Sequence, residues 1–344
     1  MGGTSPKFVA VVIPSYRVRA HILDVLARVG PEVSAIYVVD DACPEDSGRM
    51  VEENVTDPRV KVLRNAVNLG VGGATLNGMR QAALDGAEVI VKIDGDGQMD
   101  PTHIPSFAGV ILSGEADYAK GNRFFEPECV ASMPVARLFG NAGLSFLAKI
   151  STGYWHCFDP TNGYVAIHAS LLPLLPIEKI AKRYFFESDM LFRLGLLGAR
   201  VVDVPMYAYY GEEKSGMKPL REMPRFAGAH LRNFGKRIVY TYFLRNFSVA
   251  SVELALGLAL SAFGAVYGSL NWGFRAPATA GTVMVAALPI IVGVQLLLAF
   301  LNYDIGSAPN QALYPRLRTS GRTMVALRHH DDTTQCLDGK RQVV

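Results

Sequence analysis

The chain has 344 residues, 50% of them hydrophobic, and its 34 Lys and Arg nearly balance its 31 Asp and Glu. The resulting formal charge of +3 is too small to indicate nucleic acid as a partner. The four cysteines, Cys43, Cys129, Cys157 and Cys336, are widely separated and form no CxxC pair. They indicate neither a zinc site nor a disulfide framework, and a reducing, cytosolic compartment is expected.

The first hundred residues alternate between short β-branched runs and helical stretches. Strands are predicted at residues 8–13, 35–40, 60–64 and 89–94, and helices at residues 20–29, 46–54 and 72–85. Strand and helix in alternation predict an α/β domain whose parallel sheet carries helices on both faces. Further strands, predicted at 117–120, 164–167 and 200–204, extend this domain over residues 1–225.

Polar residues follow several of these strands directly, at residues 14–16, 40–41, 65–68 and 94–96. Such positions face the ligand crevice of a parallel sheet, because the carboxyl ends of the strands meet at one edge. We therefore expect the binding site at this edge.

The chain becomes apolar after residue 225. Residues 226–247 interleave aromatic side chains with four Arg and Lys residues, which predicts a helix lying in a membrane interface. A surface helix packed on the globular domain is the alternative. Two apolar segments follow, at 248–270 and 280–303, and each is long enough to cross a hydrocarbon core. We predict a transmembrane hairpin.

The charges around the hairpin predict its orientation. The connection 271–279 carries only Arg275, whereas Arg245 precedes the hairpin and Arg316 and Arg318 follow it. By the positive-inside rule, the globular domain and both termini are cytoplasmic. Residues 304–344 lack apolar periodicity and are predicted to form a poorly ordered cytoplasmic tail. Hairpins of this kind can also pack between protomers, which allows a homo-oligomer.

The strongest short motif is VKIDGDGQMDP at residues 91–101. Two carboxylates, Asp94 and Asp96, follow an apolar strand, and Gly95 between them lets a phosphate come close. A turn there points both carboxylates at one divalent cation, and hard oxygen ligands favour Mg²⁺ or Mn²⁺. Such a cation bridges a diphosphate and offsets charge on a leaving nucleotide. A solvated acidic turn is the alternative, because a single DxD often occurs by chance.

A second acidic stretch, VVDDACPED at 38–46, ends a neighbouring strand. Asp41 is predicted to accept hydrogen bonds from a base or a ribose hydroxyl, and Asp46 to cap the following helix. NLGVGGA at 68–74 begins like a dinucleotide-binding fingerprint, but Thr75 stands where that fingerprint needs glycine. These glycines are instead expected to permit tight packing at a helix start.

Five motifs in order carry a resemblance to a known family. They are IPSYR at 13–17, VVDDACPEDS at 38–47, NLGVGGA at 68–74, IDGDGQMDP at 93–101 and KGNRF at 120–124. Together they resemble the family 2 inverting glycosyltransferases of the GT-A fold, most of all dolichyl-phosphate mannose synthases and bacterial polyprenyl-phosphate glycosyltransferases. The resemblance covers residues 8–210, and the hairpin after an amphipathic helix resembles the bacterial members.

The resemblance implies nucleotide contacts, metal ligands and phosphate contacts at individual positions. The nucleotide contacts are Pro14, Tyr16 and Asp41; the metal ligands are Asp94, Asp96 and Gln98; the phosphate contacts are Arg123 and Arg137.

The stretch YFFESDMLFRLG at 184–195 looks like the acceptor-side helix of the family, where many members carry an ED pair whose Asp is the base. This chain has Glu187-Ser188-Asp189, one residue longer, which leaves open whether Glu187 or Asp189 faces the acceptor. Both can instead cap the helix that follows. The charged loop 211–218 is expected near the acceptor entrance, where Lys214 either binds phosphate or is merely solvated.

These patterns predict a metal-dependent glycosyltransferase that moves a sugar from a UDP- or GDP-linked donor to a polyprenyl (dolichyl or undecaprenyl) phosphate. A phosphate acceptor is ionised and needs no base, whereas a sugar hydroxyl needs a carboxylate to take its proton. One alternative is therefore a family 2 transferase with a sugar-hydroxyl acceptor in polysaccharide or glycolipid synthesis. Another is a non-catalytic, membrane-tethered nucleotide-binding protein.

Overall fold

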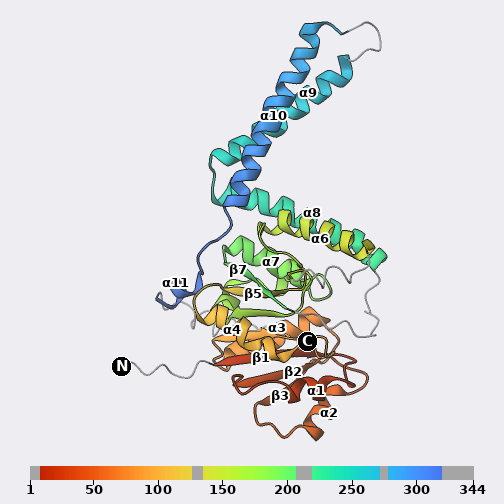
Figure 1. Cartoon of the computed structure of the whole chain (residues 1–344), viewed down its shortest axis with the longest axis vertical. Coiled ribbons are helices and arrows are strands. Elements are labelled where there is room, and N and C mark those ends of the chain that lie inside the picture. Colours follow the sequence, from red (N-terminus) through yellow and green to blue (C-terminus); the bar gives the residue numbers. More distant parts are fainter. Residues whose placement is uncertain (1–7, 126–134, 207–218, 272–277, 320–344) are drawn as a thin grey trace, which may run out of the picture.

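A computed structural model of the chain describes residues 8–125, 135–206, 219–271 and 278–319 (Figure 1). Seven strands form one sheet in the order β3-β2-β1-β4-β6-β5-β7. The strands are β1 (Val9–Ser15), β2 (Ala35–Asp40), β3 (Val60–Arg64), β4 (Val89–Lys92), β5 (Tyr118–Asn122), β6 (Val165–His168) and β7 (Val201–Pro205).

The directions of the strands determine which loops lie at the same edge of the sheet. β1 pairs in parallel with β2 and β4, and β2 pairs in parallel with β3, which confirms the parallel sheet predicted for the first hundred residues. β6 runs antiparallel to its neighbours β4 and β5, whereas β5 and β7 are parallel. The loop that precedes β6 therefore lies at the same edge as the carboxyl ends of β1, β2 and β4.

Every residue of β1, β2 and β4 is buried, so both faces of the sheet are covered. The helices of this domain are α1 (Ile22–Ala27), α2 (Ser47–Asn54), α3 (Val71–Leu84), α4 (Ile104–Leu112), α6 (Val135–Thr152) and α7 (Phe186–Leu197). Short 3₁₀ helices η1 (Pro101–His103), η2 (Ala169–Leu174) and η3 (Ile177–Lys179) connect them. At the start of α3, a Cβ on Gly72 would come 2.7 Å from the Ala181 carbonyl oxygen, so this glycine permits close packing, as expected.

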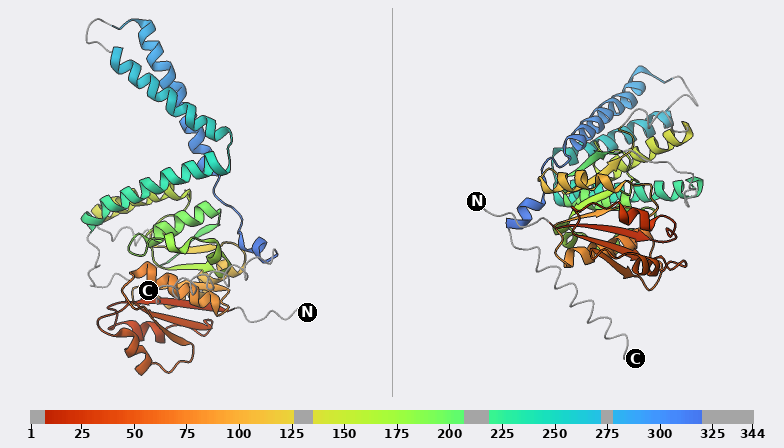
Figure 2. Two further views of the ribbon diagram at one scale, coloured as in Figure 1. Left: turned by 180° about the vertical axis from the view of Figure 1, so that it is seen from behind. Right: turned by 60° about the horizontal axis from the view of Figure 1, so that its bottom comes forward.

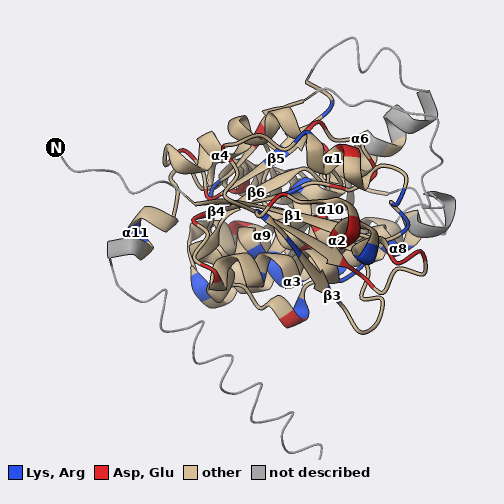
Figure 3. Ribbon diagram, turned by 90° about the horizontal axis from the view of Figure 1, so that it is seen from below, with Lys and Arg blue, Asp and Glu red and all other residues tan. Residues whose placement is uncertain are grey.

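Two long helices, α9 (Val249–Asn271) and α10 (Ala280–Gly306), project away from the sheet domain (Figure 1). Both are long and apolar enough to cross a membrane, and only 22% and 11% of their most apolar windows are buried within the protein. A core helix of a soluble domain would be mostly buried. At the end of the sheet domain opposite this hairpin, by contrast, Lys and Arg are interspersed with Asp and Glu (Figure 3).

Small residues hold the two long helices together. A Cβ on Gly264 would come 2.5 Å from the Ala286 carbonyl oxygen, and one on Gly293 would come 2.8 Å from the Ser261 backbone nitrogen. Glycine lets the two helix backbones approach closely, and small residues serve the same purpose where helices of membrane proteins pack together.

A buried carboxylate joins the hairpin to the domain below it. α8 (Pro219–Ile238) continues as a π-helix, η4 (Val239–Arg245), before α9 begins. Asp304 near the end of α10 is 3% exposed, and Arg237 donates to it at 2.6 and 2.9 Å. Tyr242 Oη and Trp155 Nε1 also donate to Asp304, at 2.5 and 2.8 Å, while Arg237 donates to the Ile150 carbonyl oxygen at 2.8 Å.

The chain returns from the hairpin to the sheet domain through α11 (Tyr314–Thr319). The buried Asp117 accepts hydrogen bonds from the backbone nitrogens of Leu313 and Tyr314, at 2.7 and 2.8 Å. The Tyr314 ring stacks on His168 with centroids 3.8 Å apart, and its hydroxyl donates to the Ile111 carbonyl oxygen. Both ends of the hairpin are thereby tied to the same domain.

The prediction of a poorly ordered tail is wrong for residues 304–319. α10 continues to Gly306, and α11 packs on the core of the sheet domain. Apolar periodicity does not detect such a segment, because one aromatic side chain and two backbone nitrogens on a distant carboxylate hold it. Residues 320–344 lie outside the described residues.

We predict that Asp304→Ala lowers the free energy of unfolding by about 3–5 kcal/mol, because it leaves the Arg237 guanidinium buried and unpaired. Thermal unfolding of detergent-solubilised protein measures the effect. Glu53→Ala is the control, because it breaks a surface ion pair with Arg49. The Glu53 and Arg49 side chains are 58% and 67% exposed, and such pairs contribute at most about 1 kcal/mol. Equal midpoints for the two variants would contradict the role of Asp304.

Candidate functional site

The pairing register brings the polar strand ends together at one edge of the sheet. Ser15 at the end of β1 pairs with Asp40 at the end of β2, and Val12 pairs with Lys92 at the end of β4. The residues that follow β1, β2 and β4 are therefore neighbours, as expected from the sequence.

Asp40 caps the helix that follows β2. Its buried carboxylate accepts from the backbone nitrogen of Cys43 at 2.8 Å and from that of Gly48 at 2.7 Å. Asp46 occupies the N-cap position of α2 in a left-handed conformation, but its side chain makes no capping hydrogen bond. The predicted capping role of Asp46 is wrong, because Asp40 at the end of β2 already accepts the hydrogen bonds from this turn.

Asp41 holds the loop that leads into α3. The residue is 2% exposed, and its carboxylate accepts from Asn65 Nδ2 at 2.7 Å, from Leu69 N at 2.9 Å and from Gly70 N at 2.7 Å. Three of about four acceptor positions of the carboxylate are thus used within the protein. Its contact with a nucleotide stays a prediction.

The other two predicted nucleotide contacts differ in exposure. Pro14 is buried inside β1, opposite Val39. Tyr16 is 41% exposed, and the Arg17 guanidinium lies 5.5 Å from the centre of its ring. Cys43 Sγ accepts from the backbone nitrogen of Arg17 at 3.2 Å and fixes this turn. Tyr16 therefore offers an accessible aromatic surface at the site, whereas Pro14 can contribute only through its backbone.

The acidic turn after β4 presents two partly exposed carboxylates. The Asp94 side chain is 30% exposed, and Asp96 Oδ1 accepts from the backbone nitrogen of Gln98 at 3.0 Å. Gly97 has φ of 80°, which favours glycine. A Cβ on Gly95 would lie 3.1 Å from Ile22, so this glycine also lets the turn pack against α1.

Lys92 lies behind this turn and was missed from the sequence. It is 1% exposed, and its ammonium is 2.7 Å from Asp94 Oδ1 and 3.7 Å from Glu187 Oε1. Burial opposes the charged form, but Asp94 and Glu187 outweigh it and keep the pKa of Lys92 above its ordinary value. In the sequence, Lys92 can be recognised as a single charged residue at the end of an otherwise apolar strand.

The structure separates the two carboxylates of α7. Glu187 faces Lys92, and burial raises its pKa although the ammonium opposes that shift. Asp189 accepts instead from the backbone nitrogen of Ala181 and from Asn233 Nδ2 on α8, both at 3.0 Å. Glu187 is therefore placed beside the acidic turn, whereas Asp189 joins α7 to a loop and to α8.

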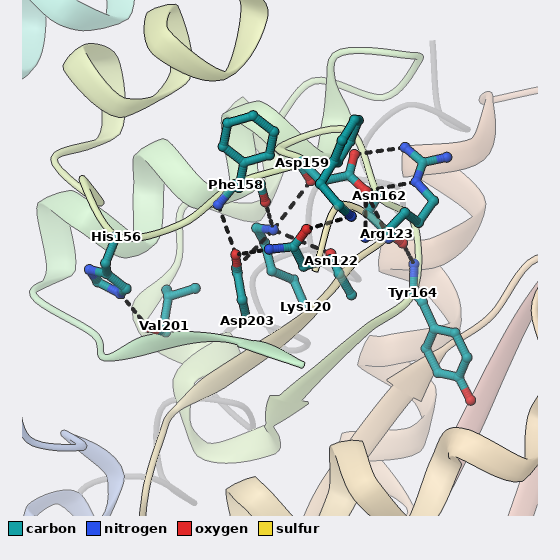
Figure 4. Close-up of polar contacts among 12 residues, drawn as sticks. Lys120, Asn122, Arg123, His156, Phe158, Asp159, Asn162, Tyr164, Val201 and Asp203 are labelled. Atoms are coloured by element: carbon teal, nitrogen blue, oxygen red, sulfur yellow. Dashed lines mark hydrogen bonds and ion pairs between the residues drawn. The ribbon is translucent and has the colours of Figure 1, made fainter. Parts of the chain in front are cut away.

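Arg123 is held by a buried partner. Its Nε and one terminal nitrogen each donate to the Asp159 carboxylate at 2.7 Å, and Asn162 Nδ2 donates to the same group at 3.1 Å (Figure 4). Burial opposes ionisation of Asp159, yet the Arg123 guanidinium holds the pKa of Asp159 below its usual value. Asp159 was not predicted, because its partner is 36 residues away in sequence.

A second buried lysine fixes the loop that carries Asp159. The Lys120 ammonium is 2.9 Å from Asp203 Oδ1 and donates to the carbonyl oxygens of Phe158 and Asp159 (Figure 4). Asp203 Oδ2 in turn accepts from Asn122 Nδ2 and from the Phe158 backbone nitrogen. The orientation of Arg123 is thus determined by strands β5 and β7.

Two predicted phosphate contacts cannot be placed. Lys214 lies outside the described residues, and Arg137 is in α6 but its side chain is not described.

The acidic turn fits a cation that arrives with its substrate. Among the described residues, no group of three or more His, Cys, Asp or Glu side chains could hold a metal ion. Mg²⁺ is commonly bound by one or two carboxylates, with substrate phosphates and water completing the shell. Asp96 and Gln98, on one tight turn, carry side-chain oxygens of the kind that Mg²⁺ prefers. The third predicted ligand, Asp94, pairs with Lys92 through Oδ1, and the metal-binding role of all three stays a prediction.

Comparison with known proteins decides the family. A family model described as glycosyl transferase family 2 matches residues 10–173. An undecaprenyl-phosphate mannosyltransferase of Micrococcus luteus is 32% identical over 202 residues, covering 58% of this chain and 82% of that protein. The chain belongs to glycosyl transferase family 2. It is therefore a glycosyltransferase, as the motifs predicted.

Two further similarities were found, one in sequence and one in fold. A UDP-N-acetylglucosamine–dolichyl-phosphate N-acetylglucosaminyltransferase of Methanococcus voltae is 28% identical over 220 residues, covering 60% of this chain and 87% of that protein. The structure of glucosyl-3-phosphoglycerate synthase from Mycobacterium tuberculosis with uridine-diphosphate gives a TM-score of 0.50 at 21% identity, covering 67% of this chain and 80% of that chain. The latter likeness concerns the fold, which is of the GT-A type.

For this family 2 enzyme, we predict that changes to the two α7 carboxylates have different effects. Glu187→Gln should lower sugar transfer at least about tenfold with little change in melting temperature, because it removes a charge at the acidic turn but keeps the shape. Asp189→Ala should instead destabilise the protein by about 1–3 kcal/mol, because it leaves two buried hydrogen-bond donors without an acceptor. Steady-state rates normalised to folded protein, together with melting curves, distinguish the two. Loss of turnover in folded Asp189→Ala would overturn this division.

Proposed function

We propose that this enzyme moves a sugar from a UDP- or GDP-linked donor to a polyprenyl phosphate at a membrane surface, with Mg²⁺ or Mn²⁺ as cofactor. The relatives from Micrococcus luteus and Methanococcus voltae are named for transfer to undecaprenyl phosphate and dolichyl phosphate. The observation that carries the proposal is the apolar hairpin whose two ends are tied to a family 2 catalytic domain. An acceptor confined to a bilayer is best met by an enzyme confined there.

The region beneath the hairpin suits a membrane interface. α6 and α8 lie side by side between the sheet domain and the hairpin (Figures 1 and 2). Large apolar side chains here are exposed, among them Leu231 (66%), Leu244 (73%) and Phe247 (70%). Basic residues share the same segment, which is the composition of helices that lie in the headgroup region. This supports the predicted interfacial helix over a packed surface helix.

The connectivity of the hairpin supports a cytoplasmic catalytic domain. Because the chain enters α9 from η4 and returns from α10 to the sheet domain, both ends of the hairpin lie on the same side. The basic residues Arg245 and Arg316 flank those ends, and by the positive-inside rule such residues favour the cytoplasmic side.

Each part of the site has a role in transfer to a phosphate. The base of the donor would lie at the ends of β1 and β2, with Tyr16 as a stacking surface. Asp96 and Gln98 would hold the divalent cation, which supplies Lewis-acid stabilisation of the leaving diphosphate. Arg123, oriented by Asp159, would bind a phosphate group of donor or acceptor. The lipid phosphate would attack the anomeric carbon from the opposite face, with inversion.

One observation favours a sugar-hydroxyl acceptor instead. Glu187 is buried at the acidic turn with a raised pKa, which is how a carboxylate is prepared to accept a proton. With a phosphate acceptor, Glu187 has only to position a partner. The two acceptors therefore differ in what Glu187 must do.

A labelled-transfer assay tests the proposal. Detergent-solubilised protein is incubated with polyprenyl phosphate and a panel of radiolabelled UDP- and GDP-sugars, with Mg²⁺, with Mn²⁺ or with EDTA. Metal-dependent label in the organic-extractable lipid is expected with one class of donor. Donor turnover that labels a sugar acceptor but never the lipid would overturn the lipid-phosphate proposal.

We predict that Asp96→Ala lowers this transfer by more than about 100-fold, because a cation that stabilises the leaving group is lost. Its melting curve should match that of the unaltered enzyme. Asp100→Asn is a control four residues further on, where the carboxylate accepts from Arg28 and Thr102 rather than facing the site. Retained activity in Asp96→Ala would contradict the metal assignment.

A further inference from the structure

A buried ammonium stands behind the acidic turn without being part of it. Lys92 lies at the end of β4 between apolar strands, with Val12 and Val165 as its register partners. Removing a charge from water costs several kcal/mol unless partners repay it. The contacts of the Lys92 ammonium must therefore offset this cost.

The partners of Lys92 come from different parts of the chain. Asp94 belongs to the acidic turn, and Glu187 belongs to α7. The loop before β6 closes the third side, where a Cβ on Gly163 would come 2.5 Å from Lys92 Nζ and 2.9 Å from Asp94 Oδ2. The ammonium thus joins a carboxylate of the turn to a carboxylate of a helix, and the absence of a side chain at residue 163 leaves room for both.

Lys120 on β5 is a second buried lysine in the same sheet, with a different set of partners. It is as deeply buried as Lys92, but it donates to backbone carbonyl oxygens at residues 158 and 159 and pairs with Asp203. Lys92 contacts two carboxylates at the candidate site, and one of them, Asp94, is 30% exposed. The two buried lysines therefore differ in whether their partners can reach a ligand.

The negative charge of the site explains why the Lys92 ammonium is useful there. Asp94, Asp96 and Glu187 bring three carboxylates to the edge where an anionic diphosphate must bind. A divalent cation offsets only part of this charge, and like charges at short range repel strongly in a partly buried site. Lys92 compensates one carboxylate before any ligand arrives.

We propose that Lys92 is a positioning residue for donor binding, whose ammonium holds Asp94 Oδ1 and Glu187 so that Asp94 Oδ2 is left to the donor. Asp96 and Gln98 then hold the cation, and Asp94 does not compete for it. This inference rests on the proposed function, because it requires a nucleoside diphosphate at the acidic turn. It also assigns Gly163 a role, since a side chain there would displace both partners.

Binding of nucleotide to the full-length, detergent-solubilised protein tests the inference without any acceptor. UDP and GDP are titrated with Mg²⁺ by calorimetry into the unaltered enzyme, Lys92→Met, the double variant Lys92→Met/Glu187→Gln, and Lys61→Met. Lys61 is the matched control, since it is a strand lysine paired with Asp85 at the surface, 49% exposed. Melting curves are recorded for every variant.

Lys92→Met should weaken nucleotide binding at least about tenfold, because a charge-assisted contact that orders the site is lost. Its melting temperature should fall, and Glu187→Gln in the double variant should restore it by removing the uncompensated charge. The double variant should nevertheless bind nucleotide as weakly as Lys92→Met, and Lys61→Met should bind normally.

Two results would overturn the inference. The first is a Lys92→Met variant that binds nucleotide with the same affinity as the unaltered enzyme. The other is normal affinity in the double variant, which would mean that Lys92 serves only to neutralise Glu187. If the unaltered enzyme binds neither nucleotide, the proposed function fails and this inference falls with it, so the two failures are distinguishable.

Discussion

Parallel pairing of β1 with β2 and β4 is the constraint on which the rest of the site depends. It sets the ends of these strands side by side, so that Tyr16, Asp41 and Asp94 share one edge although they are far apart in sequence. The reversal of β6 then adds the loop that precedes this strand, with Asp159 and Gly163, to the same edge. A donor can be surrounded because four chain segments converge there.

Buried charge pairs turn this shared edge into a rigid site. Lys92 with Glu187, Lys120 with Asp203, and Arg123 with Asp159 each join elements separated along the chain. Such pairs add little net stability over apolar packing, but breaking one is costly, so they favour a single arrangement. The Arg237–Asp304 pair does the same for the junction between the hairpin and the domain. Buried ion pairs thus hold both the candidate site and the junction between the hairpin and the domain.

The sequence predicted what local patterns encode. The strands 35–40 and 60–64 are found at their predicted bounds, because β-branched runs between turn residues specify them. The acidic turn was recognisable because its carboxylates, Asp94 and Asp96, lie only two positions apart in sequence. Lys92 and Asp159 were missed because their roles come from contacts with residues 95 and 36 positions away. Asp46 was misassigned because Asp40, in the strand before it, takes the capping hydrogen bonds.

The most direct measurement is electron paramagnetic resonance of Mn²⁺ with the detergent-solubilised enzyme, with and without UDP or GDP. We predict that Mn²⁺ becomes immobilised only when a nucleoside diphosphate is present, since Asp96 and Gln98 supply too few ligands alone. Asp96→Ala should abolish this signal. Strong Mn²⁺ binding without nucleotide, or unchanged binding in Asp96→Ala, would contradict the claim that the acidic turn holds a cation together with its donor.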